Sequence, residues 1–438
     1  MPRRPYRAVI ASTALSLLPI VTAQAREAPA RPAIDAPELA ALGSFSIGVA
    51  DVEFVQPKQI DLPIDGKSAK TIIDRHLTMK VWYPAAKAGL GTVYHSAMTG
   101  ENGTDVPFTV LGIATPNAPR AQGTFPLVIL AHGYGNVPEA LSWLGENLAT
   151  KGYVVVAPAF RDPPINIRTV AAMTKPMTRR PLDIVFLTAE AQRRANAGQG
   201  PLAGADASRT VLIGYSMGGY GVLTAAGAPI NPKLGELTQG ALTPYADGGV
   251  RQGEIKVADL KAVVAIAPPK AVRGINMWAA PGVGAIKTPT LFIVGSQDHT
   301  VGYDPGVRSL FNEEVHAPRY LLTFKEAGHS IALIGVPPEM GGTFFNQDWY
   351  EDAVWRKDRL LPIQMHFITA FLDRYVKGDA SKAAYIDGLV PNSSEGKWSD
   401  APIGRYSGFS PGAPASTIWK GFQPSRAVGM AFEFKPGN

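Results

Sequence analysis

Short apolar runs alternate with longer helical patterns through most of the chain, from about residue 124 onward. The apolar runs are rich in β-branched residues and predict buried strands. They are Leu127–Ala131, Tyr153–Ala157, Thr210–Gly214, Ala262–Ile266, Thr290–Val294 and Tyr320–Phe324. The helical patterns are Pro138–Thr150, Pro181–Asn196, Met217–Ala226 and Leu360–Val376. Such alternation is typical of parallel strands joined by crossover helices, which places binding residues beyond the carboxyl ends of the strands.

Two strand-like segments precede this alternation. Ile47–Val55 and Leu77–Tyr83 are separated by a polar stretch around Gly66, which indicates an antiparallel pair. We therefore expect an α/β fold with a mainly parallel central sheet, helices on both faces and antiparallel N-terminal strands. The domain is predicted to cover residues 46–377.

Three stretches fall outside the pattern. Residues 229–259 and 268–286 are longer than ordinary connections, which leaves two interpretations open: a lid or binding loop, and surface insertions without a role. Residues 378–438 are dense in Gly, Pro and Ser as far as Thr417. We predict that they form an extension packed on the domain rather than a second domain.

The first 25 residues have the parts of a secretory signal peptide. A basic start precedes an apolar run from Ala8 to Ala23, and Ala23-Gln-Ala25 supplies a cleavage site after Ala25. Residues 26–45, rich in Ala and Pro, predict a linker. The mature protein is expected to be secreted or periplasmic without a stable membrane anchor, because no later stretch approaches about 20 uninterrupted apolar residues. An uncleaved anchor is the alternative.

Composition narrows the possible chemistry. The chain is 46% apolar and 18% charged, as in globular proteins. It has no cysteine, which excludes disulfides, a thiolate metal site and a cysteine nucleophile. The formal charge of +6 is dispersed rather than concentrated in basic runs, so nucleic acid is not an expected partner. The sequence predicts no particular oligomeric state.

Ser216 is the candidate nucleophile. It lies in Gly214-Tyr-Ser-Met-Gly218, after a β-branched run and before a helical pattern, which is the context that a G-x-S-x-G nucleophile turn requires. Gly214 and Gly218 leave room for a sharp turn that lifts the serine hydroxyl above the sheet.

A serine hydroxyl needs a base that a carboxylate orients. His329 follows the last predicted parallel strand and Asp298 follows the strand before it, with Asp304 as the alternative carboxylate. His299 is disfavoured as the base because its sequence neighbour would have to orient it. The other histidines are expected to be structural or exposed: His76, His95, His132, His316 and His366. The order Ser, Asp, His is that of α/β-hydrolases.

Two backbone N–H groups are candidates for an oxyanion hole. The N–H of Met217 follows the nucleophile, and the N–H of Tyr134 lies in the turn His132-Gly-Tyr-Gly135 after the first parallel strand. The ring of Tyr134 is a candidate wall of the acyl pocket. Arg180 and Asp183 lie at the start of a predicted helix, where the helix dipole accounts for the carboxylate without catalysis.

The motifs together resemble one branch of the α/β-hydrolases, the dienelactone-hydrolase-like branch. It includes secreted esterases similar to platelet-activating-factor acetylhydrolase and polyester-degrading esterases. The resemblance rests on these segments and runs from about Gly48 to Val376: Lys80-Val-Trp-Tyr-Pro84, His132-Gly-Tyr-Gly135, Leu141–Val155, Gly214-Tyr-Ser-Met-Gly-Gly219, Gly295-Ser-Gln-Asp298 and Gly328-His329. It implies Ser216 as nucleophile, His329 as base, Asp298 as its orienter, and Tyr134 with Met217 as oxyanion donors.

Two departures from that branch limit the substrate. Dienelactone hydrolases proper use a cysteine nucleophile, which this chain lacks. Polyester hydrolases of the branch usually carry a tryptophan after the sixth strand, where this chain has Ala267-Pro-Pro-Lys270. The resemblance therefore does not imply cleavage of aromatic polyesters.

We expect an exported serine hydrolase that cleaves a small or polymeric carboxylic ester through an acyl-enzyme. No cofactor is needed and no metal is expected, because H-E-x-x-H and similar patterns are absent from the sequence. Two alternatives stay open: an amidase or peptidase with the same triad, and a binding protein that keeps only the fold.

Overall fold

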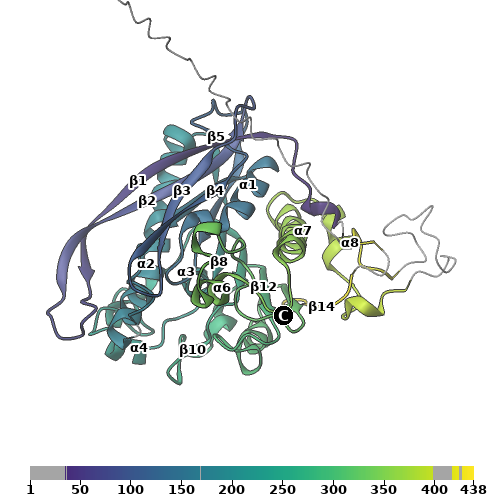
Figure 1. Cartoon of the computed structure of the whole chain (residues 1–438). Helices are drawn as coiled ribbons and strands as arrows, with labels where there is room; N and C mark the ends of the chain where they lie inside the picture. Colours follow the sequence, from purple (N-terminus) through teal and green to yellow (C-terminus); the bar gives the residue numbers. More distant parts are fainter. Residues whose placement is uncertain (1–34, 36, 168, 398–416, 424–426) are drawn as a thin grey trace, which may run out of the picture. The chain divides into compact units, whose positions relative to one another are not determined.

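Ten strands form one sheet in the computed structural model of the chain, in the order β5-β1-β2-β7-β6-β8-β9-β12-β13-β14. The long strands β1 and β2 run side by side in Figure 1. The structure describes residues 35, 37–167, 169–397, 417–423 and 427–438. These all belong to one unit that begins at Ala33, and the segment Met1–Pro32 lies outside the described residues.

Most of the strands coincide with the predicted apolar runs. Their bounds are β1 (Ser46–Asp61), β2 (Thr71–Ala85), β3 (Val93–Thr99), β4 (Asp105–Leu111), β5 (Thr115–Pro116), β6 (Phe125–Ala131), β7 (Val154–Ala159), β8 (Ala205–Tyr215), β9 (Leu260–Ile266), β10 (Ala271–Val272), β11 (Ile275–Asn276), β12 (Thr290–Gly295), β13 (Arg319–Phe324) and β14 (Met430–Lys435). The helices are α1 (Ser142–Thr150), α2 (Val170–Asn196), α3 (Met217–Ala225), α4 (Lys233–Leu237), α5 (Arg308–Glu313), α6 (Phe344–Tyr350), α7 (Lys357–Tyr375) and α8 (Ala383–Ile386).

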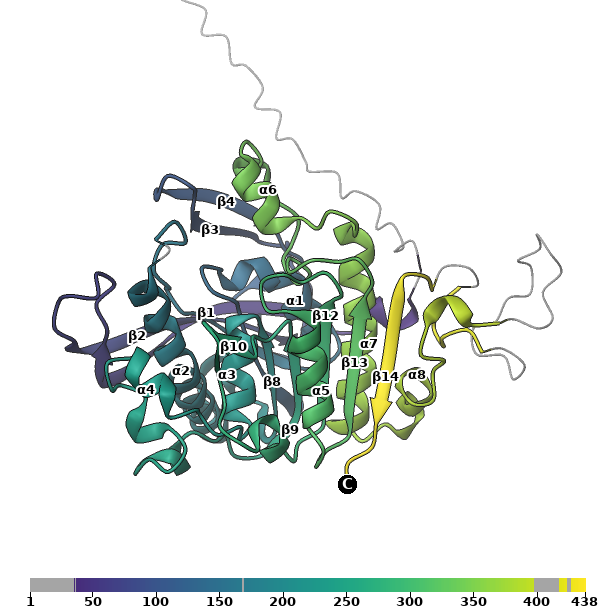
Figure 2. The same ribbon diagram turned by 90° about the horizontal axis from the view of Figure 1, so that it is seen from below.

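The central strands are apolar along their whole length because helices cover both faces of the sheet. Successive side chains of β6 show this. Val128 and Leu130 pack into one buried cluster together with α1 and α7. Leu127 and Ile129 pack into the other, together with α2, α3 and α5. Figure 2 shows α2, α3 and α5 in front of the sheet and α1 and α7 behind it.

The six predicted parallel strands are adjacent and parallel to one another. The predicted N-terminal pair is also present, since β1 runs antiparallel to β2 and β2 antiparallel to β7. These observations confirm the predicted α/β class with a mainly parallel sheet. The hairpin β3–β4 was not predicted; it lies beside α6, where the Tyr350 hydroxyl approaches the Met98 sulfur at 2.7 Å (Figure 2).

The prediction for α2 was wrong at its start. The helix begins at Val170, about three turns before Pro181. Its N-cap is Thr169, whose side chain accepts a hydrogen bond from the Ala172 N–H at 3.1 Å. Proline is favoured in a first helical turn, so Pro181 resembles a start in the sequence. The structure instead keeps both Pro176 and Pro181 inside the helix.

The two ends of the described chain pack on the sheet unit. In the segment predicted as a linker, the short turn Glu38–Ala40 lies against α7, and the Leu39 N–H donates to His366 Nδ1 at 3.1 Å. In the predicted extension, β14 adds an antiparallel edge strand beside β13. The predicted signal segment, residues 1–25, lies outside the described residues. No helix in the described ranges combines the length and the apolar character needed to span a membrane.

Candidate active site

Ser216 stands in a strained turn between β8 and α3. Its backbone has φ 52° and ψ −117°, a conformation that residues other than glycine rarely adopt. Its two flanking glycines allow this turn. A Cβ on Gly214 would lie 2.3 Å from the Gly218 carbonyl oxygen, and a Cβ on Gly218 would lie 2.2 Å from that of Ala131. The elbow therefore depends on glycine at both positions.

The structure brings the three predicted side chains together. His329 Nε2 lies 3.0 Å from Ser216 Oγ, and His329 Nδ1 lies 2.8 Å from Asp298 Oδ2. Asp298 is only 2% exposed, and its other oxygen accepts the N–H groups of Thr300 and Val301 at 2.9 and 3.0 Å. A carboxylate held in this way keeps the proton of the neutral imidazole on Nδ1. The Nε2 lone pair then faces the serine hydroxyl.

The alternative residues lie elsewhere. Asp304 and His299 are both exposed, and neither forms a hydrogen bond with Ser216 or His329 in the described part of the chain. His366 and His132 are fully buried, and burial lowers the pKa of His366 to about 3 and that of His132 to about 4. Both are neutral at ordinary pH and suited to structural roles.

Tyr215 was not singled out in the sequence, although it lies inside the nucleophile motif. Its ring stacks on that of His329 with centroids 5.3 Å apart, and its hydroxyl donates to the His329 carbonyl oxygen at 3.1 Å. Burial raises the pKa of Tyr215, so the hydroxyl keeps its proton. The tyrosine thus supports both the ring and the backbone of His329.

The turn that carries Tyr134 lies against the nucleophile. A Cβ on Gly133 would be 3.2 Å from the Ser216 Cβ, so the backbone of the turn approaches the serine closely. Within the described chain, the N–H groups of Tyr134 and Met217 donate no hydrogen bond to another residue. Both predicted oxyanion donors are therefore available to a ligand.

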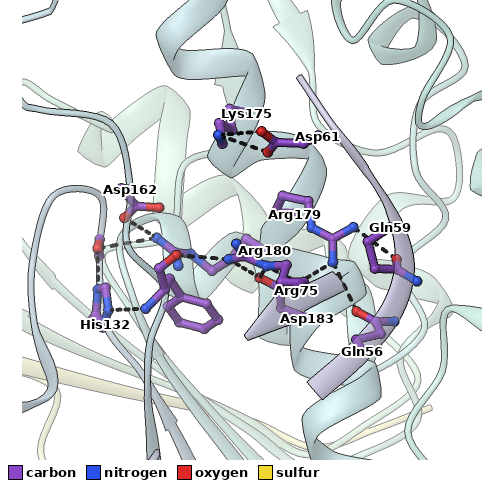
Figure 3. Close-up of polar contacts among 12 residues, drawn as sticks. Gln56, Gln59, Asp61, Arg75, His132, Asp162, Lys175, Arg179, Arg180 and Asp183 are labelled. Carbon is purple, nitrogen blue, oxygen red and sulfur yellow. Dashed lines mark hydrogen bonds and ion pairs between the residues drawn. The ribbon is translucent and has the colours of Figure 1, made fainter. Parts of the chain in front are cut away.

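A buried ion pair holds the same turn (Figure 3). Arg180 Nη2 lies 2.6 Å from Asp162 Oδ2, and the two side chains are 1% and 4% exposed. Asp162 also accepts the Gly135 N–H at 3.0 Å, while Arg180 reaches the Gly133 carbonyl oxygen at 3.4 Å. Neither residue was predicted to contribute to the site, because they come from α2 and from the loop after β7.

His132 links this cluster to the end of β7. Its Nδ1 lies 2.7 Å from the Gly133 carbonyl oxygen and must carry the proton, since a carbonyl oxygen only accepts. Its Nε2 then accepts the Phe160 N–H at 3.2 Å. Both contacts suit the neutral ring, in agreement with its lowered pKa. The structural role expected of His132 fits this geometry.

Asp183 has a different environment from the one predicted. It lies in the middle of α2 rather than in its first turn, so the helix dipole does not account for it. Arg75 Nε donates to both carboxylate oxygens of Asp183, at 2.7 and 2.9 Å, and Arg179 Nη2 donates to Oδ1 (Figure 3). These two arginines lower the pKa of Asp183 against the opposing effect of burial.

A cavity of about 370 Å³ is lined in part by Tyr134. Most of its lining is apolar and comes from the loop before α2, the first turns of α2, α4 and the β10–β11 hairpin. Its lining includes Tyr134, Ile165, Met173, Met177, Leu237 and Val272. Leu237 and Val272 belong to the two irregular segments 229–259 and 268–286, so both segments contribute to a cavity beside the candidate oxyanion turn.

The described residues contain no cluster of three or more His, Asp and Glu side chains that could hold a metal ion. The chemistry available at the site is that of a serine, a histidine, a carboxylate and two free backbone N–H groups. This set can add a nucleophile to a carbonyl carbon and stabilise the resulting oxyanion.

Comparison with known proteins gives partial matches. Residues 112–247 match the family model described as PET hydrolase-like (PETase). Cutinase 1 of Thermobifida cellulosilytica is 28% identical over 130 residues, which are 30% of this chain and 45% of that protein. Cutinase est1 of Thermobifida alba is 30% identical over 113 residues, 25% of this chain and 32% of that protein. The match thus spans less than half the length of these cutinases.

A ferulic acid esterase from Streptomyces cinnamoneus is similar in structure, with a TM-score of 0.49 and 18% sequence identity. The alignment covers 78% of this chain and 93% of that protein. The family match includes Tyr134, Ser216 and Met217 but ends before Asp298 and His329. The association of the last two residues with Ser216 therefore rests on the geometry of this chain.

Proposed function

Because the chain belongs to the α/β-hydrolase superfamily, we propose that it is a serine hydrolase that cleaves carboxylic esters through an acyl-enzyme. The observation that carries the proposal is the continuous hydrogen-bonded path from Asp298 through His329 to Ser216. The similarity of 130 residues of this chain to Cutinase 1 of Thermobifida cellulosilytica favours an ester over an amide.

In the proposed mechanism, Ser216 Oγ forms a bond to the ester carbonyl carbon while its proton passes to His329 Nε2. Asp298 stabilises the imidazolium that results. The carbonyl oxygen becomes an oxyanion that accepts from the N–H groups of Tyr134 and Met217. The bond to the alcohol oxygen then breaks, and His329 gives that oxygen the proton. Water repeats the sequence and releases the acid.

The apolar cavity beside Tyr134 suits an apolar part of the substrate. Its volume is within the usual range for small-molecule sites. Desolvation of an apolar group there contributes about 25 cal/mol for each Å² removed from water. We propose that esters with a sizeable apolar group are better substrates than acetates.

Hydrolysis of p-nitrophenyl esters tests the proposal. We expect Ser216→Ala to lower kcat by more than about 10³-fold, while Ser208→Ala, which replaces an exposed serine at the opposite end of β8, keeps the wild-type rate. Equal rates for Ser216→Ala and the wild type would falsify the assignment of the nucleophile.

The two alternatives have their own tests. An amidase needs the same groups, and matched ester and anilide substrates separate the two activities by their kcat/KM values. A binding protein without activity would fail to react with a fluorophosphonate probe, which labels only an activated serine.

We also propose that the protein is exported with removal of residues 1–25. The support is the basic, apolar and small-residue order of this segment. N-terminal sequencing of the protein recovered outside the cytoplasm is expected to begin at Arg26, and a start at Met1 would contradict cleavage.

A further inference from the structure

One buried ion pair contacts the backbone on both sides of Tyr134. Asp162 accepts the N–H of Gly135, the residue after Tyr134, and Arg180 donates to the carbonyl oxygen of Gly133, the residue before it. The two side chains also bind each other at 2.6 Å through the same Asp162 oxygen. The Gly133 carbonyl oxygen belongs to the same peptide group as the Tyr134 N–H, so one pair of charges contacts the peptide group of the candidate donor and the peptide group after it.

The pair itself is held in place by aromatic and backbone groups. The Arg180 guanidinium lies over the Phe160 ring at 3.7 Å from its centroid. The backbone of Phe160 is fixed at both ends, since its N–H donates to His132 Nε2 and its carbonyl oxygen accepts from Arg75 Nη2 at 2.8 Å. Figure 3 shows the side chains of His132, Asp162 and Arg180 close to one another. The cluster therefore has little freedom to shift.

Stability is a weak explanation for such a pair. Transferring two charges into the protein interior costs several kcal/mol for each ion, and apolar replacements of similar volume are often no less stable. A backbone turn beside a nucleophile has a different requirement. An oxyanion donor must already point at the oxyanion position before the reaction, because reorientation during the reaction would raise the barrier.

We propose that Arg180 and Asp162 are positioning residues that hold the Tyr134 N–H in the orientation of an oxyanion donor. This inference rests on the proposed hydrolase function. The pair acts through the peptide groups on either side of Tyr134 and touches no reacting atom. Gly135 has φ 63°, a conformation that glycine adopts without strain, and its own N–H donates to Asp162.

The main test removes both charges together, with Arg180→Met and Asp162→Leu in one protein, so that no lone charge stays buried. We expect kcat for a p-nitrophenyl ester to fall at least tenfold with KM within twofold of the wild type, because the lost interaction is made only in the transition state. Arg180→Lys is the second variant. It keeps the charge but lacks the planar guanidinium that lies over the Phe160 ring, and we expect the same pattern.

Arg179→Met is the matched control. Arg179 is the neighbouring residue of the same helix and is equally buried in an ion pair, but it binds Asp183, Gln56 and Gln59 rather than the turn. We expect its kcat to be unchanged. A folded double variant with wild-type kcat would overturn the proposal, and so would an equal loss of kcat in Arg179→Met.

Amide hydrogen exchange in residues 131–137 tests the positioning of the turn independently of whether the protein is an esterase. In the double variant and in Arg180→Lys, we expect the Gly135 N–H to exchange at least tenfold faster than in the wild type and in Arg179→Met. Unchanged exchange overturns the positioning role whether or not the protein is an esterase. An inactive wild type with faster exchange in the variants would instead reject the esterase proposal and leave the positioning of the turn supported.

Discussion

The ring of Tyr215 stacks on that of His329, and its hydroxyl donates to the His329 carbonyl oxygen. The tyrosine precedes Ser216 in the chain, so one short segment supplies both the candidate nucleophile and a support for its base. A histidine that must accept a proton, rotate little and return the proton benefits from contacts to its ring and to its backbone.

Two variants of Tyr215 separate these contacts. Tyr215→Phe keeps the stacked ring and loses only the hydrogen bond, so we expect kcat to fall by a few fold. Tyr215→Leu loses both contacts, and we expect a loss of more than tenfold, which corresponds to about 1.4 kcal/mol. Steady-state kinetics on one p-nitrophenyl ester, with thermal unfolding as the control for folding, checks the order. Equal losses in the two variants would show that the ring contact contributes nothing.

Asp298→Asn tests the carboxylate. An amide in this position favours the wrong tautomer of the histidine, and in a comparable triad this change lowers kcat by about 10⁴-fold. We expect a loss of at least 10³-fold, measured on the same ester. Asp304→Asn is the matched control, because its exposed side chain lies outside the hydrogen-bonded path. Activity that falls in Asp304→Asn and not in Asp298→Asn would assign the carboxylate to the alternative residue.

Strand periodicity and local motifs were sufficient to predict the parallel part of the sheet, its N-terminal antiparallel pair and the three side chains that meet at the carboxyl ends of the strands. Ser216 comes directly after β8, and Asp298 and His329 lie in the loops that follow β12 and β13, so the carboxyl ends of these three parallel strands bring them together. Once the sheet was predicted, the proximity of the three side chains followed from geometry alone.

The supporting residues could not be predicted in this way. Arg180 and Asp162 contact the Tyr134 turn from segments 47 and 27 residues away, and such contacts leave no periodic pattern in the sequence. The start of α2 was predicted too late because Pro181 resembles a first helical residue. The same error placed Arg180 at the start of the helix rather than within it, so its direction toward the turn was not predicted.

Met173→Trp tests the cavity. Met173 is half-buried in α2 and lines the cavity, so an indole there would occupy part of the space proposed for an apolar group. We expect kcat/KM for p-nitrophenyl octanoate to fall at least tenfold and that for the acetate to change less than twofold. Val250→Trp is the control, since Val250 is 95% exposed in the same irregular segment as Leu237. Equal losses for the two esters would place the apolar group elsewhere.

His366 predicts how stability responds to acid. Burial, reinforced by the nearby charge of Lys151, lowers its pKa to about 3. In the unfolded chain the pKa is about 6.5. As the pH falls below 6.5, the unfolded state takes up a proton that the folded state does not bind, so stability is lost between about pH 6.5 and pH 3. At pH 5 the loss from this one residue is about 2 kcal/mol.

His366→Asn removes the titration and keeps a side-chain acceptor for the Leu39 N–H. We expect the decrease in the free energy of unfolding between pH 7 and pH 5, measured with urea, to be smaller by about 2 kcal/mol than in the wild type. His95→Asn replaces an exposed histidine and should leave the decrease unchanged. If both variants lose as much free energy of unfolding between pH 7 and pH 5 as the wild type, protonation of His366 does not cause the acid sensitivity. The contact between the Glu38–Ala40 segment and α7 is then insensitive to protonation.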